Sequence, residues 1–192
     1  MVSDLKVLER RVATRYMEDG FWDMYLGLMA LAFGLTILLD VSYLTGVMVA
    51  VGFALQRTGK SLVTFPRIGY IKLRQARKTG MVSILSGVLI LGLMIFMLFM
   101  LGDDNPLRAF VIQNMLFFIA FIWGGAVALA ALSLNVRRFY FYSLLIFSAV
   151  IFSDLVGSLG LNLALAGGLI ILAGLVVMLR FIRKYPIVSD QD

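Results

Sequence analysis

The sequence predicts an all-α, polytopic integral membrane protein whose six transmembrane helices form three tandem αα-hairpins. The first observation is composition, because 61% of the 192 residues are apolar, 15% are charged and the mean hydropathy is +0.98. A soluble domain of this length cannot cover so much apolar surface, whereas lipid solvates the outward faces of membrane helices. The other two observations are the lengths of the apolar segments and the placement of the basic residues.

Six apolar segments are candidates for crossing the bilayer, which takes about 20 helical residues. They cover residues 21–39, 43–55, 81–101, 107–134, 139–155 and 159–179. The second and fifth are the shortest, so four spans with two re-entrant segments is one alternative. A division into two halves of opposite topology, with the short segments in matching positions, is another.

The basic residues predict the orientation of these segments. Of the 17 Lys and Arg residues, only Arg108 lies on the side where the connections after the first, third and fifth segments fall. The others lie in the N-terminal stretch, in the connections after the second and fourth segments, and near the C-terminus. The positive-inside rule then predicts a multi-pass protein of the cell membrane with both termini in the cytoplasm.

The N-terminal stretch, residues 1–20, predicts an interfacial amphipathic helix, because its apolar residues repeat on one narrow arc. Arg10 and Arg11 lie off that arc and are predicted to contact anionic headgroups or a cytoplasmic protein partner. The transmembrane domain is predicted over residues 21–184, and residues 185–192 form a short cytoplasmic tail.

The connection over residues 57–79 is the longest polar segment and is strongly basic. If it is helical beyond Pro66, four basic residues share one stripe of about 100°. These residues are Arg67, Arg74, Arg77 and Lys78. A stripe so close to the membrane favours anionic lipid or a protein partner over nucleic acid.

Polar residues within the apolar segments are the candidates for a binding site. Asp23 lies just inside the first segment, where a carboxylate either faces a partner or favours the helix N-terminus. Arg67 and Tyr70 would complete an ion-pair cluster with it. Gln113 and Asn114 lie in the fourth segment, where interhelical hydrogen bonding is the expected role and solute binding the alternative.

Aspartates end the segments on the predicted outer side: Asp40, the pair Asp103 and Asp104, and Asp154. Helix capping at the water boundary explains these aspartates, and an external cation site is the alternative interpretation. Asp154 therefore joins the candidate residues.

Small residues recur at four-residue intervals, which predicts close helix packing and a homodimer as one outcome. They are Ala30/Gly34, Gly46/Ala50/Ala54, Ser83/Gly87, Ala120/Gly124/Ala128 and Ala164/Gly168.

The chain contains neither Cys nor His, which removes thiol chemistry, zinc sites and histidine-based catalysis. We therefore expect no cofactor, no resident metal and no enzymatic activity. The predicted function is a non-enzymatic membrane scaffold whose basic cytoplasmic face contacts anionic lipid or a protein partner. The alternative is a small-solute transporter or channel with a site between the short second and fifth segments.

Overall fold

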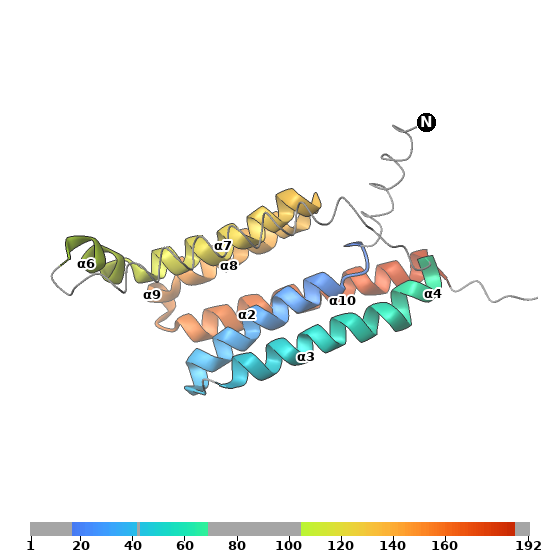
Figure 1. Ribbon diagram of the computed structural model, residues 1–192, viewed down its shortest axis with the longest axis horizontal. Helices are drawn as coiled ribbons and strands as arrows, with labels where there is room; N and C mark the ends of the chain where they lie inside the picture. Colours follow the sequence, from blue (N-terminus) through green and yellow to red (C-terminus); the bar gives the residue numbers. More distant parts are fainter. Residues whose placement is uncertain (1–16, 42, 69–104, 187–192) are drawn as a thin grey trace, which may run out of the picture. The chain divides into compact units, whose positions relative to one another are not determined.

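The structure is a computed structural model that describes residues 17–41, 43–68 and 105–186 of the chain. Every regular element within these ranges is a helix (Figure 1). The chain divides into two compact units: one combines its first and last parts, and the other is its middle part.

The first unit is a hairpin of two helices with the last helix packed along it. The elements are α2 (Phe21–Leu39), α3 (Tyr43–Gly59), the π-helical turn η1 (Lys60–Thr64), α4 (Phe65–Ile68) and α10 (Leu159–Lys184). The turn after α2 passes through Asp40, whose φ of 54° lies in the left-handed region. The second helix of the hairpin, α3, continues directly through η1 into α4.

Glycines bring α2 and α10 into backbone contact. Facing glycines recur every seven residues on both helices and meet in antiparallel order: Gly20 with Gly174, Gly27 with Gly167, and Gly34 with Gly160. A Cβ added to Gly27 would lie 2.7 Å from Ile171 N and 2.8 Å from Gly167 O. Seven residues are about two helical turns, so the glycines form one continuous stripe on each helix. This stripe lets the two backbones touch along most of their length.

Helix α3 packs on a different side of α2. A Cβ on Gly52 would lie 2.7 Å from a methyl carbon of Leu28 and 3.1 Å from the ring of Tyr25. Near the turn, the hydroxyl groups of Thr36 and Thr45 form a 2.6 Å hydrogen bond. These contacts fix the antiparallel register of the hairpin.

The second unit contains α6 (Pro106–Gln113), α7 (Met115–Leu134), α8 (Arg138–Ile151) and α9 (Ser153–Val156). Helix α7 ends at Asn135, which adopts a left-handed φ of 53°. Helices α7 and α8 then form an antiparallel hairpin. Residues at helical spacing on α8 are buried: Phe139, Tyr142, Ile146 and Val150. From the same helix, Ser143 donates a 2.6 Å hydrogen bond to the carbonyl of Gly124 on α7.

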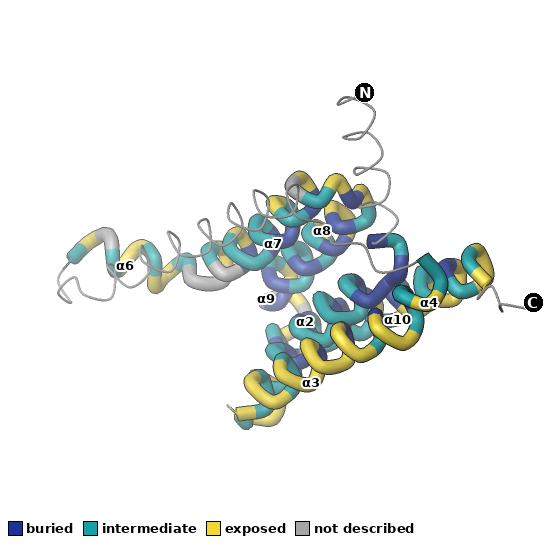
Figure 2. Tube along the Cα trace, turned by 45° about the vertical axis from the view of Figure 1, so that its right-hand side comes forward, coloured by how far each residue is buried: buried dark blue, intermediate teal, exposed yellow. Residues whose placement is uncertain are grey.

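Within the described residues, α2 and α10 are the helices long and apolar enough to cross a membrane. The apolar stretches Ala120–Leu132 and Arg138–Ile151 are shorter than a span. The outer side of α3 carries exposed apolar side chains, including Tyr43, Val47 and Leu55, and appears yellow along its length in Figure 2.

The predicted segments agree with the structure in part. The first is confirmed as α2, while α3 and α10 extend beyond the predicted ends at residues 55 and 179. The fourth and fifth segments are each interrupted, at Asn114 and at Phe152. The third segment lies outside the described residues. Three tandem hairpins also give an incomplete description, because the facing glycines place α10 beside α2 rather than with its sequence neighbours.

Candidate functional site

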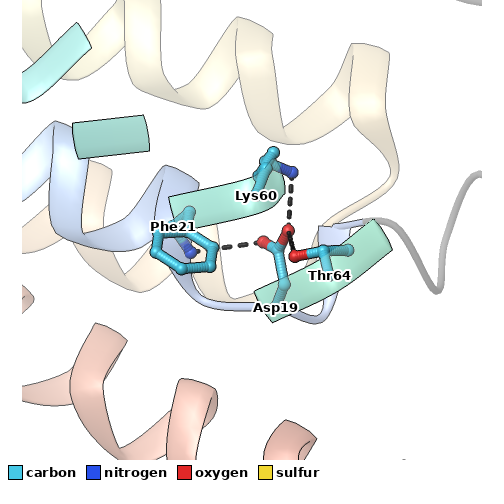
Figure 3. A network of polar contacts seen from close by, with 4 residues as sticks. All are labelled: Asp19, Phe21, Lys60 and Thr64. Atoms are coloured by element: carbon cyan, nitrogen blue, oxygen red, sulfur yellow. Dashed lines mark hydrogen bonds and ion pairs between the residues drawn. The ribbon is translucent and has the colours of Figure 1, made fainter. Parts of the chain in front are cut away.

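A buried polar cluster ties the start of α2 to the turn η1 (Figure 3). Asp19 is fully buried, and its Oδ2 lies 2.7 Å from Lys60 Nζ. The hydroxyl of Thr64 donates to the same oxygen at 3.0 Å, and the backbone N–H of Phe21 donates to Oδ1 at 3.2 Å. The carboxylate therefore caps the first turn of α2 while it holds η1.

Local sequence explains why these groups meet. Gly20 has a φ of 78° and lies against the backbone of α10 at Gly174, so the chain can turn sharply between Asp19 and α2. Lys60 and Thr64 are four residues apart, which puts both on the same side of η1. A buried carboxylate and ammonium lose much hydration, and the ion pair with its added hydrogen bonds offsets that loss.

A second ion pair joins the same end of α2 to α10. Lys184 Nζ donates to Glu18 Oε2 at 3.3 Å, with both side chains well exposed. Lys184 lies beyond the apolar part of α10, and hydrogen bonding with Tyr185 and with Glu18 raises its pKa above the ordinary lysine value. The neighbouring acids Glu18 and Asp19 thus each contact a lysine from a different helix.

The end of the first unit that contains this cluster is basic. The N-terminus of α2 meets the C-terminal ends of α3 and α10 there, as the two ion pairs require. Its exposed basic side chains are Arg57, Arg180, Arg183 and Lys184. The opposite end holds the turn at Asp40 and the start of α10 at Ser158, whose hydroxyl accepts from Leu161 N at 3.2 Å.

Asp23, the carboxylate singled out in the sequence, is fully buried and faces α10. Its Cβ lies 3.0 Å from the position that a Cβ on Gly174 would take. Arg67 donates from Nη1 to the carbonyl of Val63 at 2.8 Å, which occupies one edge of its guanidinium. Tyr70 lies outside the described residues, so the predicted cluster of Asp23, Arg67 and Tyr70 stays a prediction.

The other predicted residues lie in the second unit or beyond the described ranges. Gln113 is exposed at the end of α6, and Asn114 Nδ2 donates to the carbonyl of Phe110 at 2.8 Å. Asp154 lies in α9. The remaining basic candidates are in residues that the structure does not describe: Arg10, Arg11, Arg74, Arg77 and Lys78.

The small-residue pattern identified part of the helix packing. Gly34 and Ala164 lie in the contact between α2 and α10, and Gly124 lies against Phe147 on α8. Gly46 and Gly168 have open space where a Cβ would be. Their four-residue spacing therefore does not mark a contact within these units.

Sequence reasoning missed the cluster at Asp19. The available signal was the run Glu18-Asp19 directly before a helix and a lysine four residues before a threonine. Their meeting depends on tertiary structure.

Comparison of the chain with protein-family models, curated proteins and solved structures found no match.

Proposed function

We propose that this chain is a non-enzymatic, six-span protein of the cell membrane whose basic cytoplasmic end binds anionic phospholipid. The observation that carries the proposal is the basic end of the first unit, where Arg57, Arg180 and Arg183 are exposed. Arg57 lies on α3, whereas Arg180 and Arg183 lie three residues apart on α10, so two segments far apart in the sequence contribute to this end. The ion pairs at Glu18 and Asp19 support the same grouping, because they join the corresponding ends of α2, η1 and α10.

The acidic residues of this end favour lipid binding by the remaining arginines. Asp19 is occupied by Lys60, and Glu18 contacts Lys184, so both acids are paired with lysines. The exposed arginines form no ion pair within the described residues. Each basic residue near an anionic membrane surface contributes about 1 kcal/mol of attraction.

The test compares wild-type protein with an Arg57→Gln/Arg180→Gln/Arg183→Gln variant in detergent micelles that contain labelled phosphatidylglycerol. Loss of three contacts of about 1 kcal/mol each should weaken binding by about 100-fold. Arg108→Gln, on the predicted outer side, is the control and should bind like the wild type. Equal affinity of the triple variant and the wild type would overturn the proposal.

The alternative function is a small-solute transporter or channel. It draws support from the two interruptions of the fourth and fifth apolar segments, since discontinuous helices form substrate sites in transporters. A flux assay in sealed proteoliposomes distinguishes the two functions. The lipid-binding proposal expects no protein-dependent flux of ions or small metabolites.

A further inference from the structure

The helix that begins with α3 continues into α4 although it contains a proline. The turn η1 joins the two without a gap, and Gly59 and Phe65 on either side of it keep right-handed helical angles. In a regular α-helix, Pro66 would have no N–H to donate and its ring would clash with the carbonyl of Leu62, four residues earlier. The wider turn η1 accommodates the proline, and there the N–H of Phe65 bonds to the carbonyl of Lys60, five residues back. Helices bend at such deformations, so the local sequence makes η1 the place where this helix can bend.

The hydrogen bonds that side chains form within this helix do not fix its direction. Arg67 Nη1 donates to the carbonyl of Val63 at 2.8 Å, and Ser61 Oγ donates to the carbonyl of Thr58 at 2.8 Å. Donor and acceptor lie on the same helix in both bonds, within four residues of each other. These bonds therefore satisfy carbonyl groups around η1 without holding α4 against another helix.

The Asp19 carboxylate holds η1 from outside the helix (Figure 3). Its Oδ2 accepts from both ends of the turn, from Lys60 Nζ at 2.7 Å and from Thr64 Oγ1 at 3.0 Å. Lys60 is the first residue of η1 and Thr64 is the last. The other oxygen, Oδ1, accepts from the N–H of Phe21 at 3.2 Å. One fully buried carboxylate thus ties both ends of the deformed turn to the start of α2.

The residues that follow Asp19 are packed too closely to move independently. A Cβ on Gly20 would lie 2.9 Å from Met178 N on α10, and a Cβ on Gly59 would overlap the ring of Phe21. The start of α2 is therefore in contact with both α10 and the end of α3. Through Asp19, this packed region determines the position of η1.

We propose that η1 is a hinge, that Asp19 is its lock, and that the locked hinge positions Arg67 of α4 for anionic phospholipid at the basic end of the first unit. Arg67 lies seven residues beyond Lys60, so a kink of 20° at Lys60 displaces it by about 4 Å. Nη1 donates to Val63, and the guanidinium has further N–H donors for a lipid phosphate. The hinge and its lock are independent of lipid, whereas the role of Arg67 rests on the proposed function.

The hinge is tested by pulsed EPR distances in the full chain in detergent micelles. The chain has no native Cys, so spin labels at Ile68→Cys on α4 and Leu172→Cys on α10 form a single pair. The locked chain, with Asp19 and Lys60 in place, should give one narrow distance distribution. The unlocked variant, Asp19→Ala/Lys60→Met, removes both buried charges together, which limits its loss of stability. It should broaden the distribution by about 4 Å or more.

Two further variants distinguish a hinge from general loosening. Adding Pro66→Ala to the unlocked variant removes the cause of the deformation, so the distribution should become narrow again. Glu18→Gln breaks the exposed ion pair with Lys184 of α10, and it should leave the distribution of the locked chain unchanged. A distribution as narrow in the unlocked variant as in the locked chain would overturn the hinge. A broad distribution that Pro66→Ala does not narrow would overturn it as well.

The role of Arg67 is tested by binding of labelled phosphatidylglycerol in the same micelles. Arg67→Gln should weaken binding about five-fold in the locked chain. It should have almost no effect in the unlocked variant, because Arg67 is no longer held at the site. A purely structural role of Asp19 would not make the effect of Arg67→Gln depend on the lock.

The two kinds of failure are distinguishable. An equal effect of Arg67→Gln in the locked and unlocked chains, or no effect in either, would overturn the positioning role. If the triple variant at Arg57, Arg180 and Arg183 binds phosphatidylglycerol like the wild type, the proposed function fails. The EPR distances decide the hinge in either case.

Discussion

Replacing Gly167 with Ala should destabilise the protein, whereas the same change at its neighbour Gly168 should not. A Cβ on Gly167 would lie 2.7 Å from Gly27 O and 2.8 Å from Leu31 Cα. A Cβ on Gly168 would have nothing within 4 Å. Favourable carbon contacts need about 3.5–4.0 Å, so α2 and α10 must separate by roughly 0.7 Å or more to admit the methyl group.

The magnitude follows from the difference between the two variants. Both gain the same helix propensity from Gly to Ala, up to about 1 kcal/mol, so that contribution cancels. Overpacking destabilises a protein by about 1–3 kcal/mol, and of the two variants only Gly167→Ala is overpacked. We therefore expect Gly167→Ala to be less stable than Gly168→Ala by about 1–3 kcal/mol.

The assay is reversible unfolding of the detergent-solubilised protein by denaturant, followed by circular dichroism. Gly27→Ala, on the opposite helix, should behave like Gly167→Ala because it meets Ile171 N at 2.7 Å. Free energies of unfolding for Gly167→Ala and Gly168→Ala that agree within about 0.5 kcal/mol would refute the close packing of α2 and α10. A difference of that size is no larger than the usual scatter between stability effects at independent sites.

The polar contacts of the first unit give three more predictions, all measured by the same unfolding assay. Asp19→Ala should lower the free energy of unfolding by about 3–5 kcal/mol, because Lys60 stays buried without its carboxylate. Adding Lys60→Met should restore most of that stability. A double variant no more stable than Asp19→Ala would contradict this. Thr36→Val should lose about 1 kcal/mol with its hydrogen bond to Thr45, and no loss would mean that the bond does not contribute. Glu18→Gln should change stability by less than about 1 kcal/mol because its ion pair is exposed, and a loss as large as that of Asp19→Ala would be inconsistent with that exposure.

The sequence predicted the helices whose signals are local. The apolar run from Phe21 ends at Asp40, and the structure places α2 between Gly20 and Asp40. Extension of α10 to Lys184 was missed because basic residues lower the hydropathy without ending a helix. The breaks at Asn114 and Phe152 were also missed, since neither position carries proline or glycine.

Packing between distant segments was harder to predict. A search at four-residue spacing found Gly34 and Ala164 but not the seven-residue series that pairs Gly27 with Gly167. That series is visible in the sequence once the two helices are known to be antiparallel. The contact of Asp19 with Lys60 spans 41 residues and depends on the turn at Gly20, so no local pattern reports it.

The central claim, a six-span chain with its basic end in the cytoplasm, is tested most directly by labelling single cysteines in intact cells. The chain has no native Cys, so each introduced thiol is unique. With a membrane-impermeant maleimide, Ser42→Cys and Asn105→Cys should react in intact cells. Thr58→Cys and Ser189→Cys should react only after the cells are opened. Labelling of Thr58→Cys or Ser189→Cys in intact cells would contradict the proposed topology.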